Sequence, residues 1–163
     1  MPNNKLIILD RDGVINLDSD QYIKNAQEWI PIESSLKAIA KLNKANYKVA
    51  VATNQSGIAR GYFSHQTLKD MHDKMTTELA KFGGHIDAIE YCSDHPDKPS
   101  IYRKPQPGML FLLFKQFNVK PEETWFVGDS SSDIECAANA NCKAALVLTG
   151  KGKKTLNTGV DSK

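Results

Sequence analysis

The sequence predicts an α/β fold in which a parallel sheet of about five strands carries helices on both faces. Short apolar segments rich in β-branched residues alternate with longer segments in which apolar residues recur at helical spacing. Several of the short segments end abruptly in Asp, Thr or Asn. This alternation is typical of consecutive β-α-β units, whose strands lie parallel.

Short apolar segments are the expected strands. The first of them is almost continuously apolar and ends in charge, which indicates a central strand buried on both faces. The expected strands cover residues 5–9, 47–52, 86–91, 124–127 and 144–148.

Helices are predicted between these strands. The first opens near Ile32, and Ser64 caps the second. The third begins at Pro107, where the missing N–H costs nothing, and the fourth covers residues 134–139. Their apolar residues recur every three or four positions, so one side of each helix can pack on the sheet.

Two aspartates follow the first strand directly. Asp10 and Asp12 are two positions apart, so in an extended segment both side chains point the same way and Arg11 points the other way. Gly13 allows a sharp turn next to them. Two neighbouring carboxylates repel each other unless a cation joins them, and oxygen ligands favour Mg²⁺.

Other polar residues follow later strands. Thr53, Asn54 and Gln55 come after the second strand, where a hydroxyl and amides can hold phosphoryl oxygens. Asp129 and Asp133 come after a later strand, and the ends of parallel strands are where α/β sheets bind ligands. Asp129 is expected to reach the metal. Asp133, with Ser130 beside it, is expected to bind the metal or to orient its ligands.

Lys104 supplies a positive charge in a segment stiffened by Pro105 and Pro107. Each of these features also has a plain structural interpretation: an Asp-rich turn, a helix cap at Thr53, a solvated charge at Lys104, and a capping region over residues 130–133. Their joint occurrence at three strand ends favours a phosphate-processing site.

In this order the motifs resemble the haloacid dehalogenase (HAD) superfamily of phosphotransferases, over residues 5–149. Three stretches are similar to one subgroup, the D-glycero-D-manno-heptose 1,7-bisphosphate 7-phosphatases, which are related to the histidinol phosphatases. These stretches are residues 10–16, 53–61 (Thr-Asn-Gln-Ser-Gly-Ile-Ala-Arg-Gly) and 103–109 (Arg-Lys-Pro-Gln-Pro-Gly-Met). The resemblance implies a Rossmann-like sheet and a role in nucleotide-heptose supply for surface glycans.

The resemblance also implies roles for the site residues. Asp10 would be the nucleophile that forms an aspartyl-phosphate, and Asp12 the general acid and base. Mg²⁺ would be held by Asp10, Asp129 and the backbone carbonyl of Asp12. Thr53 and Lys104 would complete the catalytic set. The residues expected to bind substrate are Asn54, Gln55, Ser56, Arg60 and Arg103, of which the arginines would meet the second phosphate.

The chain departs from this subgroup at the zinc loop that many members carry. Cys92 is present, but Asp94 stands where the ligand histidine would fall, and His95 is displaced. A structural zinc needs four ligands, so we expect none here. Cys136 and Cys142 form no CxxC pair and are expected to be small apolar side chains.

Composition fits one soluble domain. The chain has 163 residues and a net charge of +2, which argues against nucleic acid or an anionic membrane as a partner. No apolar stretch approaches the roughly 20 residues of a membrane span, and the first strand follows the start without a signal peptide. We expect a cytoplasmic monomer with a single domain over residues 1–149, no cap domain, and a mobile tail over residues 150–163.

Three functions therefore remain open. The first is a Mg²⁺-dependent phosphatase for a small phosphorylated sugar, the heptose bisphosphate. The second is another phosphomonoesterase of the same architecture, such as a histidinol phosphatase or a nucleic-acid 3′-phosphatase, although the chain lacks the basic stripe of the latter. The third is a binding module without catalysis.

Overall fold

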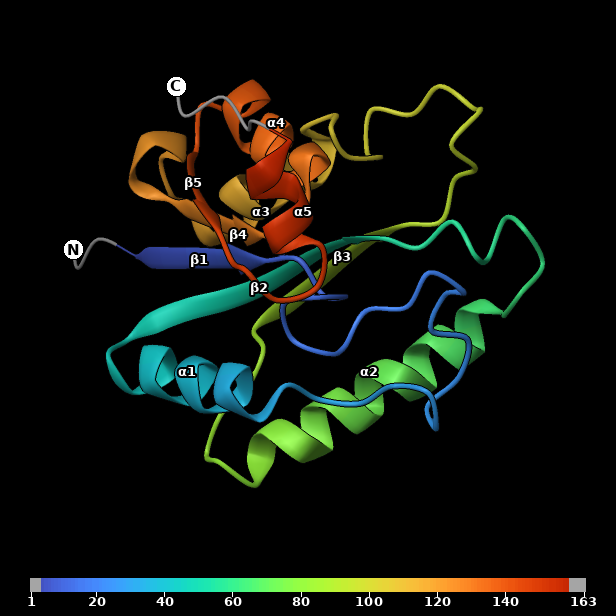
Figure 1. Ribbon diagram of the computed structural model, residues 1–163. Coiled ribbons are helices and arrows are strands. Elements are labelled where there is room, and N and C mark those ends of the chain that lie inside the picture. The colour runs from blue at the N-terminus through green and yellow to red at the C-terminus, as the bar shows by residue number, and fades with distance from the viewer. Residues whose placement is uncertain (1–3, 159–163) are drawn as a thin grey trace.

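The computed structural model describes residues 4–158 and contains a five-stranded parallel sheet (Figure 1). The strands lie in the order β3-β2-β1-β4-β5, and helices cover both faces, so the predicted fold class is confirmed. The strands are β1 Lys5–Leu9, β2 Tyr47–Asn54, β3 Ala88–Cys92, β4 Trp125–Gly128 and β5 Lys143–Leu146.

The helices lie between these strands, with one more after the last. They are α1 Glu33–Lys44, α2 His65–Ala80, α3 Gly108–Phe117, the 3₁₀ turn η1 Pro121–Glu123, α4 Ser131–Asn139 and α5 Gly152–Asn157. Ser64 caps α2, as predicted, by accepting a hydrogen bond from the N–H of Thr67. Within residues 4–158, no helix has both the length and the apolar character needed to cross a membrane.

The sheet separates two apolar cores. Alternate residues of β2 point to opposite faces: Val49 and Val51 pack with α1 and α2, whereas Ala50 and Ala52 pack with α3 and α4. β1 does the same with Leu9 on one side and Leu6 and Ile8 on the other. Because both faces are covered, the inner strands are apolar at nearly every position, which is the pattern that the sequence shows.

The strand order creates a crevice at the carboxyl edge of the sheet. The chain runs from β1 outward to β2 and β3, then crosses back to β4 on the other side of β1. Ligands bind at such a reversal because the loops on its two sides diverge. Asp10 follows β1 and Asp129 follows β4, so the two carboxylates flank this position.

Long loops lie beside this crevice. Within the described chain, residues 10–32 and 55–64 contain no regular helix or strand, apart from isolated bridges that Asn16 makes with Asp12 and Pro31. No cap domain is therefore inserted at either position. The end of β2 also differs from the prediction, because Thr53 and Asn54 pair with β3 and are the last residues of the strand.

The expectation of a mobile tail from Gly150 is wrong for residues 150–158. Helix α5 forms there, and Gly152 and Thr155 are buried. A short lysine-rich sequence resembles a tail, but here packing against the loop after β4 orders it. The remainder of the expected tail, residues 159–163, lies outside the described residues.

Candidate active site

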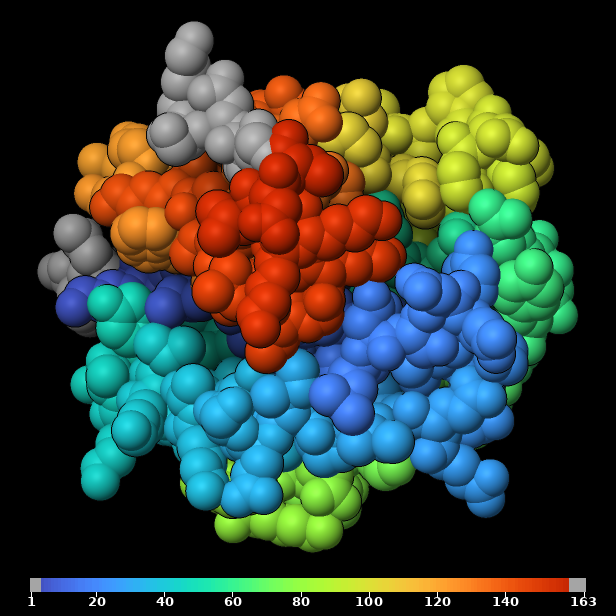
Figure 2. Space-filling view, viewed as in Figure 1, coloured from blue at the N-terminus to red at the C-terminus, as the bar shows by residue number. Residues whose placement is uncertain are grey.

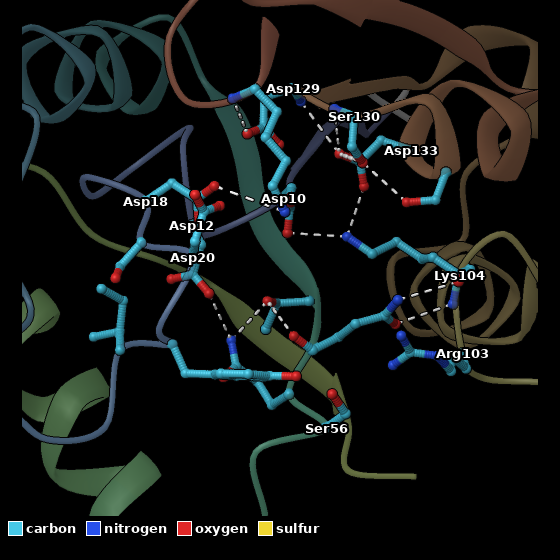
Figure 3. A pocket seen from close by; sticks show the side chains of 18 residues that line it. Asp10, Asp12, Asp18, Asp20, Ser56, Arg103, Lys104, Asp129, Ser130 and Asp133 are labelled. Carbon is cyan, nitrogen blue, oxygen red and sulfur yellow. Dashed lines mark hydrogen bonds and ion pairs between the residues drawn. The ribbon is translucent and has the colours of Figure 1, made fainter. Parts of the chain in front are cut away.

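A cavity of about 330 Å³ lies at the carboxyl edge of the sheet (Figure 3). Its walls come from the ends of β1, β2 and β4, the loop that follows β1, the loop that precedes α3, the first turn of α4 and Lys151. Every residue expected at the site lines the cavity except Arg60: Asp10, Asp12, Thr53, Asn54, Gln55, Ser56, Arg103, Lys104, Asp129, Ser130 and Asp133.

Three carboxylates form one cluster in this cavity. Asp10 follows β1, Asp129 follows β4, and Asp133 lies in the first turn of α4. Their ligand oxygens lie within 4.8 Å of one another. Burial, and then the negative charge of Asp133, raise the pKa of Asp10, and burial together with Asp133 also raises the pKa of Asp129.

A hard divalent cation fits this cluster. Carboxylate oxygens are the ligands that Mg²⁺ prefers, and its charge would offset the repulsion that raises the two pKa values. Gly13 and Gly150 let the backbone lie close against the carboxylate of Asp129, since a Cβ on either residue would overlap it. The set of carboxylate donors suits the expected Mg²⁺.

Lys104 balances part of this negative charge. Its Nζ lies 2.9 Å from Oδ1 of Asp10 and 2.7 Å from Oδ1 of Asp133, and it donates to the backbone carbonyl of Ala52. Burial alone would lower the pKa of Lys104, but the two carboxylates raise it above its usual value. Lys104 is therefore a permanent cation directed at Asp10.

Asp133 is bound by the protein on both of its oxygens. Oδ1 accepts from Lys104, while Oδ2 accepts from the hydroxyl of Ser130 at 2.9 Å and from the N–H groups of Asp129 and Ser130. Burial would raise the pKa of Asp133, but Lys104 and these hydrogen bonds lower it. This bonding favours an orienting role for Asp133 and Ser130.

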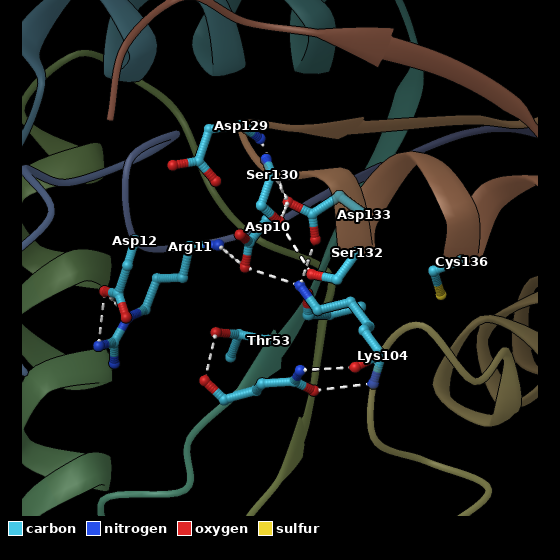
Figure 4. Close-up of polar contacts among 12 residues, drawn as sticks. Asp10, Arg11, Asp12, Thr53, Lys104, Asp129, Ser130, Ser132, Asp133 and Cys136 are labelled. Atoms are coloured by element: carbon cyan, nitrogen blue, oxygen red, sulfur yellow. Dashed lines mark hydrogen bonds and ion pairs between the residues drawn. The ribbon is translucent and has the colours of Figure 1, made fainter. Parts of the chain in front are cut away.

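Asp10 and Asp12 line the cavity and Arg11 does not, as the alternation predicts, but the guanidinium of Arg11 unexpectedly binds Asp12. Its Nε and Nη2 donate to Oδ1 of Asp12 at 2.9 and 2.8 Å (Figure 4). The turn at Gly13 ends the extended conformation on which the alternation was based. Burial would raise the pKa of Asp12, but Arg11, with Asn16 and Gln55, lowers it.

The residues at and just after the end of β2 have two different roles. Nε2 of Gln55 donates to Oγ1 of Thr53 at 3.0 Å and to Oδ2 of Asp12 at 3.3 Å, so these groups share one polar wall. Asn54 instead binds the backbone N–H and carbonyl of Lys104 at 3.0 and 3.1 Å. The amide of Asn54 therefore positions Lys104, rather than only facing a substrate as expected.

The two expected arginines differ. Arg103 lines the cavity, and its Nη1 is buried without a hydrogen-bond partner among residues 4–158. Arg60 lies outside the cavity wall, with its guanidinium 5.9 Å from the ring centroid of Tyr22. Because Tyr22 itself lines the cavity, Arg60 borders the site only through this ring.

Seven further lining residues were not predicted: Asp18, Ser19, Asp20, Tyr22, Ile23, Ser132 and Lys151. In Figure 3 the aspartates lie on the wall opposite Lys104 and Arg103. The alternating acids of residues 18–20, close behind Asp12, were a signal that sequence reasoning did not use. Lys151 was missed because its segment resembled a tail.

The C-terminal segment holds Asp129. The backbone N–H of Lys151 donates to Oδ2 of Asp129 at 2.9 Å, and the hydroxyl of Thr155 donates to its backbone carbonyl at 2.8 Å. Thr149 donates to the carbonyl of Gly13 at 2.6 Å. Figure 2 shows the same segment (red) against the loop that follows β1 (blue). This part of the chain completes the site.

Cys92, the residue left from the zinc loop, is buried. Its thiol donates to Oδ2 of Asp94 at 3.4 Å and lies 3.8 Å from the hydroxyl of Ser100. Burial raises the pKa of Cys92, which disfavours the thiolate that zinc requires. The absence of a structural zinc stays a prediction.

Comparison with known proteins identifies the family. A family model described as "HAD-hyrolase-like" matches residues 101–161. A D-glycero-beta-D-manno-heptose-1,7-bisphosphate 7-phosphatase from Pseudomonas putida is 52% identical over 156 residues, which cover 96% of this chain and 89% of the relative. The chain belongs to the HAD-like phosphatases.

Other HAD-like phosphatases agree in sequence and in structure. The enzyme of the same name from Neisseria meningitidis serogroup B is 53% identical over 94% of this chain and 82% of the relative. The crystal structure of D,D-heptose 1,7-bisphosphate phosphatase from B. bronchiseptica, complexed with magnesium and phosphate, has a TM-score of 0.94 and 48% identity. It covers 97% of this chain and 89% of that chain. The family expected from the motifs is confirmed.

Proposed function

We propose that the protein removes the C7 phosphate of D-glycero-β-D-manno-heptose 1,7-bisphosphate in a Mg²⁺-dependent reaction. The observation that carries the proposal is that Asp10, Asp12, Lys104 and Asp129 line one cavity. Relatives about half identical to the chain are named for this activity and this anomer, and the similar B. bronchiseptica enzyme is described with magnesium and phosphate.

Asp10 begins the reaction. Its carboxylate oxygen attacks phosphorus, and the bond between phosphorus and the sugar oxygen breaks while Asp12 gives that oxygen a proton. Asp12 is ionised in the free protein because its pKa is low. A phosphate dianion bound beside it raises that pKa, which favours the acid form in the complex.

Water completes the reaction. Asp12 takes a proton from the water that attacks phosphorus, and the bond between phosphorus and Asp10 breaks to release inorganic phosphate. Asp10 is then a free carboxylate again, and Asp12 carries a proton again, as it did in the substrate complex. The same carboxyl group is therefore acid in one step and base in the next.

Positive charge and hydrogen-bond donors stabilise the transferring group. The ammonium of Lys104 already lies at Asp10, so it faces the oxygens of any phosphoryl group attacked there. Thr53, Gln55 and Ser56 offer polar atoms on the adjoining wall. Magnesium, when bound by Asp10, Asp129 and the backbone of Asp12, supplies further charge neutralisation.

Arg103 is the proposed ligand of the second phosphate. It lines the cavity, and its buried Nη1 has no hydrogen-bond partner among residues 4–158, so a phosphate oxygen would satisfy this nitrogen. The acidic wall made by Asp18 and Asp20 offers acceptors to sugar hydroxyls. A molecule with phosphates at one side and hydroxyls at the other matches these two walls.

Release of inorganic phosphate from a substrate panel tests the proposal. The panel contains the heptose bisphosphate, histidinol phosphate, p-nitrophenyl phosphate and an oligonucleotide 3′-phosphate, each with Mg²⁺ and with EDTA. The bisphosphate should give the highest kcat/KM, with heptose 1-phosphate as product and no turnover in EDTA. A higher kcat/KM on another substrate would refute the assignment of the heptose bisphosphate as the substrate. If no member of the panel released phosphate, the protein would be a binding module.

Two further properties stay proposals. We infer a monomer, and we infer a cytoplasmic location because the cysteines form no pairing pattern. Light scattering behind size-exclusion chromatography tests the first, and fractionation of producing cells tests the second.

A further inference from the structure

Arg11 is an unusual residue to find wholly buried. Its side chain is 0% exposed, and it lies between the two catalytic aspartates in sequence. Burying an arginine is costly unless its charge is paired and its N–H groups find acceptors. Within residues 4–158, Asp12 is the only carboxylate at ion-pair distance from this guanidinium.

The pairing occupies one oxygen of Asp12. Oδ1 accepts from Nε and Nη2 of Arg11 and from Nδ2 of Asn16, at 2.8 to 2.9 Å. Among the described residues, Oδ2 has a single long contact, 3.3 Å from Nε2 of Gln55. The Asp12 side chain is 25% exposed and lines the cavity, so Oδ2 is the oxygen available to a reacting group.

His72 holds the other end of the guanidinium. Nη1 of Arg11 lies 3.3 Å from Nε2 of His72 and 3.6 Å from Sδ of Met71, and both of these residues are buried in α2. A guanidinium can only donate, so Nε2 of His72 must accept, which requires the neutral ring with its proton on Nδ1. His72 of helix α2 thus holds one end of the Arg11 guanidinium, and the other end of the guanidinium holds Asp12.

We propose that Arg11 and His72 are positioning residues, which lock Oδ1 of Asp12 so that Oδ2 alone transfers the proton. This inference rests on the proposed phosphatase function and assigns the oxygen that acts. In the first step Oδ2–H gives its proton to the leaving sugar oxygen as that oxygen separates from phosphorus. In the second step Oδ2 takes a proton from the attacking water.

A purely structural role predicts a different result. If Arg11 and His72 only fill the core, their loss lowers stability and affects all substrates equally. If they position the acid, the loss depends on the leaving group, because an alkoxide needs a proton to leave whereas p-nitrophenolate does not. The kcat/KM value reports the first step for both substrates, which makes their ratio the decisive quantity.

The test compares His72→Leu with Met75→Leu, a volume-conserving change at a buried residue of the same helix. For His72→Leu, kcat/KM on a sugar phosphate should fall at least about tenfold more than kcat/KM on p-nitrophenyl phosphate. Met75→Leu should leave the ratio within about twofold. An unchanged ratio in folded His72→Leu would overturn the proposal.

Further variants keep the proposal testable if His72→Leu does not fold or if the substrate assignment is wrong. His72→Gln, which keeps an acceptor, should restore most of the ratio, and Arg11→Met replaces His72→Leu if the latter does not fold. Adding His72→Leu to Asp12→Asn should leave the ratio of the two kcat/KM values as it is in Asp12→Asn alone, since both substitutions act through the side chain of Asp12. Any alkyl phosphate that the wild type hydrolyses serves here, so failure on the heptose would refute only the substrate assignment.

Discussion

The hydroxyl of Thr155 donates a hydrogen bond to the backbone carbonyl of Asp129 across 2.8 Å, and both groups are buried. This contact joins the C-terminal helix α5 to a residue of the carboxylate cluster. A segment that resembles a tail in sequence is therefore part of the proposed metal site.

Thr155→Val is expected to weaken Mg²⁺ binding about tenfold, because residues that orient metal ligands contribute on that scale. Isothermal titration calorimetry with Mg²⁺ measures the effect. Thr155→Ser keeps the hydroxyl and should bind Mg²⁺ like the wild type. Equal affinity in all three proteins would show that α5 does not position Asp129.

Asp129→Asn should have opposite effects with and without metal. In EDTA the melting temperature should rise, because burial and Asp133 oppose the charge of Asp129. With Mg²⁺ the stabilisation seen in the wild type should disappear, and Mg²⁺ affinity should fall more than about a hundredfold. Asp70→Asn, at an exposed residue of α2, should change neither value. A wild-type Mg²⁺ response in Asp129→Asn would contradict the assignment.

Gly150→Ala is expected to damage the metal site. Gly150 has a φ of +55°, and a Cβ there would overlap the Asp129 carboxylate. Gly83→Ala is a matched control, since Gly83 has a φ of +77° and open space around it. Both changes should cost about 1 kcal/mol of stability through the backbone, but only Gly150→Ala should weaken Mg²⁺ binding in calorimetry. Equal Mg²⁺ affinities would exclude the steric argument.

Arg103→Ala should raise KM for the sugar bisphosphate about tenfold and leave KM for p-nitrophenyl phosphate nearly unchanged. The reason is that an aryl phosphate lacks the second phosphate, whose contact with a guanidinium is a charged hydrogen bond. Steady-state kinetics on both substrates measure the difference. Lys98→Ala removes an exposed charge from the same loop and should affect neither KM. Equal losses on both substrates would remove the second-phosphate role.

His72 should make stability depend on pH. Burial, with the cation of Arg11, lowers the pKa of His72 from 6.5 to about 4. The unfolded chain then binds a proton at pH values where the folded protein does not, so stability is full above pH 6.5 and falls as the pH drops toward 4. By about pH 5 the loss is about 2 kcal/mol. Urea unfolding of wild type and His72→Gln should show this slope in the wild type alone.

Local patterns determined the fold and most of the candidate site. Apolar runs with β-branched residues predicted the parallel strands, and the rule that ligands bind at carboxyl ends brought Asp10, Thr53 and Asp129 to one edge. Lys104 lies on a loop and not at the end of a strand, so its prediction as a site residue also required the Arg-Lys-Pro motif. These inferences succeed because strand periodicity and the direction of parallel strands depend on short stretches of chain.

The tertiary structure alone decided which groups meet across the fold. Thr149 and Gly13 are 136 positions apart and still share a hydrogen bond, and Nη1 of Arg11 finds an acceptor on α2. No local pattern encodes such contacts, since they depend on the path of the whole chain. The sequence therefore determined which chemical groups reach the carboxyl edge, while packing decided which of them hold the others in place, because a buried charge takes its partner from whatever element lies opposite.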